Sequence, residues 1–230
     1  MSPLLAAIIL APTQSLTFVQ LEEKKVTALN QLTGFRGTYV MVSLPYEGIG
    51  IRQEVTLTIS PEGRRTKLMV NGTVVGESAY NKKTKWTAIH GEKKYQVSEP
   101  PAGFKLPPDS DPITAATGQL NLTLDDLGPR FATNPAPTLT GPREETIEGK
   151  KLTRYDAKTV SAATNAQVQI IQWFDPNTFI VRRFEIIKTT DGKVSTVKGY
   201  LVNDTMNTKI NISEYDLPAD IARTYRRIEG

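Results

Sequence analysis

The sequence has 230 residues, of which 39% are hydrophobic and 23% are charged. These proportions are ordinary for a globular protein with a buried core, and they exclude wholesale disorder. Cysteine is absent, which excludes disulfides, a thiolate nucleophile and cysteine-ligated metals. The 28 Lys and Arg residues against 24 Asp and Glu residues give a net charge of +4, which is too small to indicate a nucleic-acid partner by itself.

Four short basic runs could still form a nucleic-acid footprint, but acidic residues stand near most of them. We therefore interpret the runs as solvated surface charge and predict no nucleic-acid partner. They lie at Arg64–Arg65, Lys82–Lys85, Lys93–Lys94 and Arg226–Arg227.

Residues 1–15 contain an apolar run, Leu4 to Ala11, followed by polar residues. The run has the length of a secretory h-region and is far shorter than the ~20 residues of a membrane span. Cleavage after Ser15 would leave small residues at the −1 and −3 positions, although no Lys or Arg precedes the run. The alternative is a terminal strand or helix end packed on the core. We predict a signal peptide over 1–15 and an exported protein, periplasmic or extracellular, with no membrane-spanning segment.

Residues 16–33 are predicted to form one amphipathic helix. Apolar residues recur there at three- and four-residue steps, while the charged residues 22–25 occupy the other side. Gly34 is expected to end the helix, because glycine readily adopts a positive φ. A one-faced helix needs a surface to lie on, and the rest of the chain must supply it. The apolar positions are Phe18, Val19, Val26, Leu29 and Leu32.

The residues that follow carry the signals of antiparallel strands joined by tight turns. Residues 52–60 alternate between apolar and polar side chains, as in a sheet with one solvated face. Pro61–Gly63 and Asn71–Gly72 are turn sequences, so each strand is expected beside its predecessor. The strands predicted in this half are 35–44, 52–60, 65–70, 73–80, 85–89 and 93–97.

The middle of the chain changes character. Residues 99–112 carry five prolines and cannot form a regular element. Residues 112–127 are predicted to form a helix, or two short ones, with Ile113 and Leu120 on the apolar side. Residues 128–142 are predicted to be a second connection.

Strand signals return from Glu144 onward. A two-residue apolar break at Ile171 interrupts the alternation of its strand, and we expect a bulge there. This half has no helix of its own to cover a sheet, so a single domain over 16–230 is simpler than two domains. The strands predicted in this half are 150–158, 166–174, 179–189, 193–203 and 208–215.

No residue pattern indicates catalysis. His90 is the only histidine and lies in a predicted polar turn, and no nucleophile-elbow, phosphate-loop or zinc-protease motif occurs. The adjacent carboxylates Asp125–Asp126 and Glu144–Glu145 are interpreted as solvated charges, because a catalytic dyad is assembled by the fold rather than by adjacency. We predict no enzyme activity, no catalytic residue, no cofactor and no metal.

The remaining feature is a surplus of apolar residues on one side of a curved antiparallel sheet. The predicted fold class is α+β, an unclosed half-barrel with helices covering its concave face. Either the helices fill that face and everything is core, or the covering leaves a pocket for an acyl chain or another apolar ligand. The residues predicted to line the face are Val55, Leu57, Ile59, Leu68, Val70, Trp86, Ile186, Ile210 and Ile212, and the predicted lid residues are Phe18, Val26, Leu29, Ile113 and Leu120.

The order of these segments resembles the outer-membrane lipoprotein carrier (LolA/LolB-like) superfamily, which includes related periplasmic lipoprotein-localisation and stress-sensor domains. The resemblance covers roughly residues 16–220 and is carried by short motifs. These are PEG at 61–63, NGTVVGESAYNKKTKW at 71–86, KKYQV at 93–97, QWFDPNTFIVRRFE at 172–185 and YDLP at 215–218.

This resemblance implies a non-catalytic periplasmic transport protein or chaperone. An eleven-stranded half-barrel under a helical lid would hold the acyl chains of a lipid or lipoprotein. In the lipoprotein carriers an arginine on an early strand after the proline turn helps to lock the lid, and the nearest positions here are Arg65 and Lys67. The absent cysteine differs from the anchored receptor branch. The alternative is an envelope protein-interaction or stress-sensing domain on the same scaffold, with an envelope protein as its partner.

Overall fold

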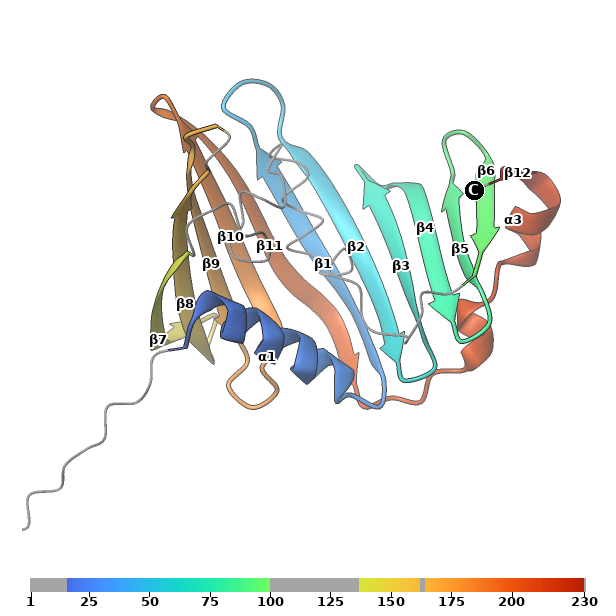
Figure 1. Cartoon of the computed structure of the whole chain (residues 1–230), viewed down its shortest axis with the longest axis horizontal. Coiled ribbons are helices and arrows are strands. Elements are labelled where there is room, and N and C mark those ends of the chain that lie inside the picture. The colour runs from blue at the N-terminus through green and yellow to red at the C-terminus, as the bar shows by residue number, and fades with distance from the viewer. Residues whose placement is uncertain (1–15, 100–136, 162–163, 230) are drawn as a thin grey trace, which may run out of the picture.

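The computed structural model describes residues 16–99, 137–161 and 164–229, which form one large curved sheet with few helices (Figure 1). Twelve strands are hydrogen-bonded in the order β12-β6-β5-β4-β3-β2-β1-β11-β10-β9-β8-β7, and the sheet is unclosed. The helical elements are α1 (Phe18–Asn30), the 3₁₀ helix η3 (Ile212–Tyr215) and α3 (Ala219–Thr224). The strands are β1 (Phe35–Leu44), β2 (Ile51–Ser60), β3 (Gly63–Val70), β4 (Thr73–Asn81), β5 (Lys85–Ile89), β6 (Lys94–Ser98), β7 (Thr138–Ile147), β8 (Lys150–Val160), β9 (Gln167–Phe174), β10 (Val181–Thr190), β11 (Lys193–Met206) and β12 (Arg226–Arg227).

Two meanders make up the sheet. In β1 to β6 and in β7 to β11, every strand lies antiparallel beside its predecessor, as predicted. The meanders join where β1 pairs with β11, with Tyr39 opposite Leu201. The two-residue β12 adds a parallel edge next to β6. The predicted antiparallel sheet is confirmed, together with a short edge strand that the sequence pattern did not indicate.

Helix α1 begins and ends close to its predicted bounds. The Thr17 side chain accepts a hydrogen bond from the Gln20 backbone N–H, and the Gln20 side chain accepts one from the Thr17 backbone N–H. This capping box satisfies two amides that have no partner within the helix. Gly34 does not act through a positive φ, because its backbone is not in that region. A Cβ on Gly34 would instead collide with the carbonyl oxygen of Thr208.

The buried stripe of α1 differs from the predicted one. Leu21 and Lys25 are buried together with Phe18 and Leu29, whereas Val19 is 39% exposed. These four buried residues follow steps of three, four and four, which is the spacing of a single helix face. Lys25 was predicted on the charged side, but its amine is buried in an ion pair with Glu22.

The prediction of a strand over 208–215 is wrong. β11 continues to Met206, and the chain then turns at Asn207, whose φ is +54°. Asn211 accepts a hydrogen bond from the Ser213 backbone N–H and caps η3. Asparagine side chains that bond to nearby backbone compete with sheet pairing, so the apolar alternation at Ile210 and Ile212 does not produce a strand.

Two further predictions in the second half are corrected. β7 begins at Thr138, so part of the segment predicted as a connection is strand. The bulge expected at Ile171 is absent, because β9 pairs without a shift in register with β8 throughout. The register shift near it lies in β10, between Val181 and Arg183. The predicted helix over 112–127 lies outside the described residues.

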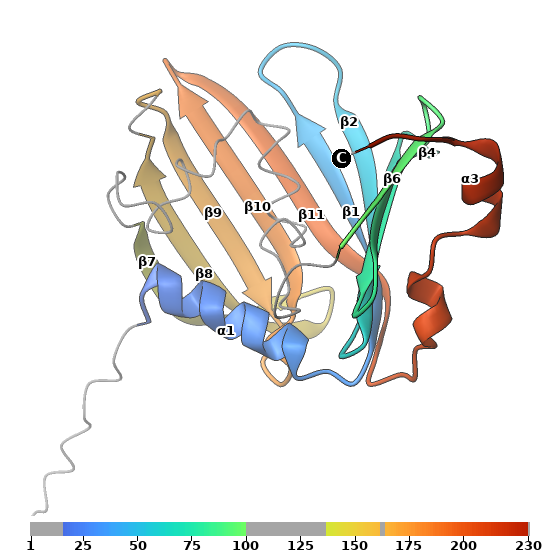
Figure 2. The same cartoon turned by 45° about the vertical axis from the view of Figure 1, so that its right-hand side comes forward.

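The curvature gives the sheet an inner and an outer face. Helix α1 lies on the inner face, across one end of the strands of the second meander, while η3 and α3 lie outside the first meander (Figure 2). Among the described residues α1 is the one helix on the inner face, and it crosses only part of that face. The rest of the predicted helical covering falls in the residues that are not described.

Candidate functional site

A continuous apolar cluster lies on the inner face of β1, β2 and β8 to β11 and joins both meanders to α1. We call it the inner cluster. Its strands contribute alternate residues, because successive side chains of a strand point to opposite faces. Its buried members are Phe18, Leu21, Leu29, Phe35, Tyr39, Met41, Val55, Leu57, Ile59, Tyr155, Ala157, Val168, Ile170, Phe174, Ile180, Val181, Phe184, Ile186 and Val197.

Two aromatic residues show how tightly the strands of this face are fitted. The ring of Phe184 lies over Gly199 of the neighbouring strand, where any Cβ would collide with it. Tyr39 donates a hydrogen bond from its hydroxyl to the carbonyl oxygen of Val181 at 2.8 Å. This bond satisfies the one polar atom of that buried side chain. Glycine and tyrosine at these positions therefore serve packing on the inner face.

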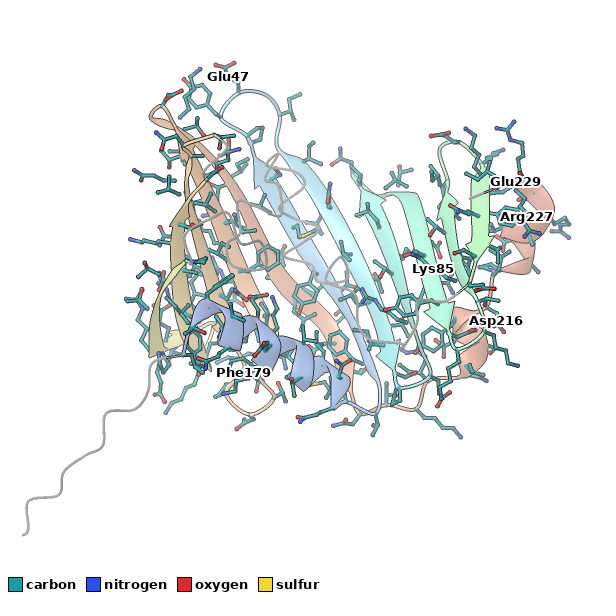
Figure 3. All side chains as sticks on the ribbon, viewed as in Figure 1. Glu47, Lys85, Phe179, Asp216, Arg227 and Glu229 are labelled. Atoms are coloured by element: carbon teal, nitrogen blue, oxygen red, sulfur yellow. The ribbon has the colours of Figure 1, made fainter. Side chains whose placement is uncertain are left out.

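The contact between α1 and the sheet is partly polar. Gln172, which is 1% exposed, donates from Nε2 to the Glu22 carboxylate at 3.1 Å. Glu22 also pairs with the buried Lys25, and Lys24 places its amine 4.3 Å from the ring centroid of Phe179. Phe179 is labelled beside α1 in Figure 3. The sequence pattern assigned residues 22–25 to solvent, so this buried polar contact was missed.

Most residues predicted to line the face lie in or against the inner cluster. Val55, Leu57, Ile59 and Ile186 are members, and Leu68 packs against it. Val70, half-buried, lies two residues beyond Leu68 on the same face of β3. Among the predicted lid residues, Phe18 and Leu29 are members and Val26 is half-buried, while Ile113 and Leu120 lie outside the described residues.

Three predicted lining residues lie elsewhere. Trp86 is buried in a second cluster on the outer face, where its Nε1 donates to the carbonyl oxygen of Tyr215 at 2.8 Å. Ile210 packs against this same second cluster. Ile212 is 44% exposed at the start of η3. None of the three shares a cluster with Val55, because the alternation of β5 turns Trp86 outward and residues 208–215 are not a strand.

The two positions considered for locking the lid also face outward. Arg65 bonds the Glu77 carboxylate at 2.5 Å and the carbonyl oxygen of Glu214 at 3.3 Å, which ties η3 to the outer face. Lys67 shares that face of β3 by alternation. Arg64 points the other way: it is opposite Ile59 in the β2–β3 pair and is 3% exposed. Arg64 is therefore a buried inner-face cation and not part of a solvated surface run.

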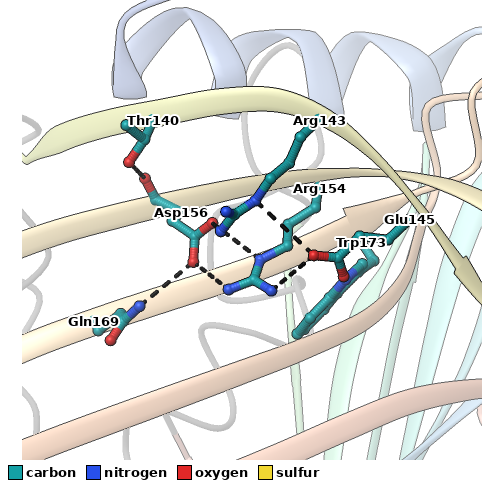
Figure 4. Close-up of polar contacts among 7 residues, drawn as sticks. All are labelled: Thr140, Arg143, Glu145, Arg154, Asp156, Gln169 and Trp173. Atoms are coloured by element: carbon teal, nitrogen blue, oxygen red, sulfur yellow. Dashed lines mark hydrogen bonds and ion pairs between the residues drawn. The ribbon is translucent and has the colours of Figure 1, made fainter.

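A polar network on the outer face joins β7, β8 and β9 (Figure 4). Asp156 accepts hydrogen bonds from Arg143 at 2.6 Å and from Arg154 at 2.7 and 2.9 Å. Glu145 accepts from Arg154 at 2.9 Å and from the Trp173 indole at 2.7 Å. Glu145 was predicted as a solvated charge, but it belongs to this network. The sequence offered no signal, because the partners come from three strands.

The two carboxylates of the network are stabilised in their charged forms. The hydrogen bond from Trp173, together with the hydrogen bond and charge of Arg154, lowers the pKa of Glu145. Burial by itself would raise the pKa of Asp156. The hydrogen bonds and charges of Arg154 and Arg143 outweigh that burial, and the pKa of Asp156 lies below its ordinary value. The network ties the edge strand β7 to β8 and β9, so we interpret it as structural support.

His90 and a pocket on the outer face are two further features of the described residues. His90 lies in the predicted turn, with Nδ1 2.7 Å from the Tyr225 hydroxyl and Nε2 3.4 Å from the Glu77 carboxylate. A pocket of about 460 Å³ lies on the outer face of β7–β10 and is lined mainly by Thr, Gln and Lys side chains.

Within residues 16–99, 137–161 and 164–229, no group of three or more His, Cys, Asp or Glu side chains could hold a metal ion. In the same ranges no helix is long and apolar enough to cross a bilayer.

No protein-family model and no curated protein sequence matches the chain. Solved structures do match it. An uncharacterised conserved protein from Thermus thermophilus has a TM-score of 0.54 at 9% identity, over 92% of this chain and 98% of that one. Lipoprotein LppX from Mycobacterium tuberculosis has a TM-score of 0.41 at 10% identity, over 84% and 96% of the two chains. A LolA superfamily protein from Nitrosomonas europaea has a TM-score of 0.35 at 10% identity, over 88% and 99%.

The likeness to the Thermus protein shows a shared fold and nothing further. That fold is a large unclosed antiparallel sheet with few helices among the described residues.

Proposed function

We propose that the protein is a non-catalytic, exported carrier or binding protein that holds an acyl chain of a lipid or lipoprotein between the inner face and α1. The observation that carries this proposal is the inner cluster itself. It is continuous across strands of both meanders, and α1 lies against it. Sites for apolar ligands are concave and mainly lined by apolar and aromatic side chains, and this face has both properties.

Helix α1 is suited to act as a lid that can move. Three apolar side chains of α1 are buried: Phe18, Leu21 and Leu29. Burying each of them contributes roughly 1.5–3 kcal/mol to the free energy that holds the helix on the sheet. The rest of the contact includes the buried pair of Glu22 and Lys25. A buried ion pair adds little net stability over an apolar contact, because both charges lose their hydration. An acyl chain could replace the apolar contacts of the helix with its own.

Arg64 is the better candidate for a residue that holds the lid. It lies on the inner face, whereas Arg65 and Lys67 face outward. A buried guanidinium strongly favours hydrogen-bonding acceptors around it. We infer that Arg64 holds the lid against the inner face. Arg65 instead holds the C-terminal η3.

The proposal is tested with a fluorescent fatty acid and two neighbouring substitutions in β3. Leu68→Asn places a polar amide against the inner cluster, while Lys67→Asn changes the outer face of the same strand. We expect wild type and Lys67→Asn to bind the fatty acid alike and Leu68→Asn to bind it at least about tenfold more weakly, since burying a large apolar side chain is worth one to two powers of ten.

Circular dichroism and the urea midpoint should show that both variants are folded. Equal binding by the three proteins would place the ligand elsewhere. No binding by the wild type, with capture of an envelope protein instead, would favour the interaction or stress-sensing alternative.

A further inference from the structure

Exposed apolar side chains gather at one end of the sheet, apart from the inner cluster. The loop between β1 and β2 carries Tyr46 and Ile49, which are 51% and 90% exposed. Leu44 and Ile51, at the strand ends that form its base, are 48% and 41% exposed, and Val194 at the start of β11 is 48% exposed. We call these five side chains the apolar tip.

Contacts with β11 hold the loop of the apolar tip in place. The backbone N–H of Tyr46 donates to the Ser195 hydroxyl at 3.1 Å, and the Lys193 amine lies 4.6 Å from the centroid of the Tyr46 ring. The same amine lies 3.8 Å from the Glu47 carboxylate. These contacts fix the base of the loop on β11. The loop arches beyond the ends of its strands in Figures 1 and 2, and Figure 3 labels Glu47 at its summit.

We propose that the apolar tip docks the protein reversibly on the surface of a phospholipid bilayer. The loop favours this partner, because Ile49 is 90% exposed and stands between two glycines, and the loop projects beyond the ends of its strands (Figure 1). A bilayer interface deforms around such a loop, whereas a protein partner would need a matching pocket. Tyrosine is also enriched at membrane interfaces, where its ring is buried and its hydroxyl stays hydrated.

The charges of the tip agree with a lipid surface. Glu47 is the one charged residue between Leu44 and Ile51, and it faces Lys193. Inserting the loop therefore does not bring an uncompensated charge into the interface, where it would be costly. Each aliphatic side chain that enters the membrane multiplies the partition coefficient about ten- to a hundredfold. A few such side chains give reversible attachment and not a permanent anchor.

The test is flotation of the full chain with vesicles of phosphatidylcholine alone and of phosphatidylcholine with phosphatidylglycerol. Wild type is expected to float with both. Ile49→Glu should lower the partition coefficient at least about tenfold on both, because a carboxylate replaces the most exposed apolar side chain. Ile212→Glu is the matched control, since Ile212 is 44% exposed but lies on η3, which contacts β3 and β4. It should float like wild type.

Three results would overturn the proposal: a wild type that stays unbound on both vesicles, an Ile49→Glu variant that floats like wild type, or a concentration-dependent dimer lost in Ile49→Glu without vesicle binding. No residue of the tip belongs to the inner cluster. Uptake of a free fluorescent fatty acid should therefore be the same in wild type and Ile49→Glu, which separates a failure of this proposal from a failure of the acyl-binding one.

Discussion

At the scale of single residues, the inner face depends on glycine where an aromatic ring crosses a strand. Phe184 is fully buried, and its ring occupies the space that a Cβ on Gly199 would need. The ring cannot swing away, because the inner cluster surrounds it. Gly76, in β4, offers the opposite case: a Cβ there would meet only the carbonyl oxygen of Ala88, at 3.6 Å.

We predict that Gly199→Ala lowers the free energy of unfolding by about 1–3 kcal/mol, the usual cost of overpacking a core. Gly76→Ala should be neutral or slightly stabilising, since alanine loses less backbone entropy on folding than glycine. Urea unfolding of both variants beside the wild type measures the difference. Equal midpoints for the two variants would show that Phe184 does not pack against Gly199 as described.

At the scale of elements, the network of Asp156 and Glu145 joins the edge strand β7 to β8 and β9. Both carboxylates have a pKa below the ordinary value in the folded protein. A group of this kind contributes stability that is fully present above its unfolded pKa, which is about 3.9 for Asp and 4.3 for Glu. That contribution is lost as the pH falls through the lower pKa of the folded state.

We therefore predict that the free energy of unfolding falls between about pH 5 and pH 3, and that Asp156→Asn flattens this dependence. The variant should also be less stable at pH 7, by about 1–3 kcal/mol, because two arginines lose a charged acceptor. Glu144→Gln is the control, since Glu144 is exposed on the same strand as Glu145, and it should keep the wild-type slope. The same slope in Asp156→Asn as in wild type would contradict this role.

At the scale of the whole molecule, the sequence could predict what depends on local periodicity. Alternation located the strands of the first meander almost residue by residue, because residues 51–60 and their turns encode one solvated face. It also placed Leu57 and Ile186 on one surface. It could not show that Trp86 faces outward, since an isolated five-residue strand does not reveal which of its faces is buried. The partners of Glu145 and Lys25 lie on other elements and were equally hidden.

Residues 208–215 show a second reason why local periodicity does not always predict structure. Ile210 and Ile212 alternate with polar residues as in a strand, but Asn211 begins a 3₁₀ turn and η3 is held by Arg65 and Trp86 from distant strands. The local Asn211 cap and these tertiary contacts together decided the conformation there, against the apolar alternation.

We propose that the inner face of this sheet receives an acyl chain under α1. Nuclear Overhauser contacts between the methylene protons of a bound fatty acid and labelled protein methyl groups test it most directly. We expect contacts to Leu57 and Ile186 of the inner cluster, and none to Leu152 or Ile171, which belong to a separate apolar cluster on the outer face. Contacts confined to Leu152 and Ile171, or a fatty acid that does not bind at all, would contradict it.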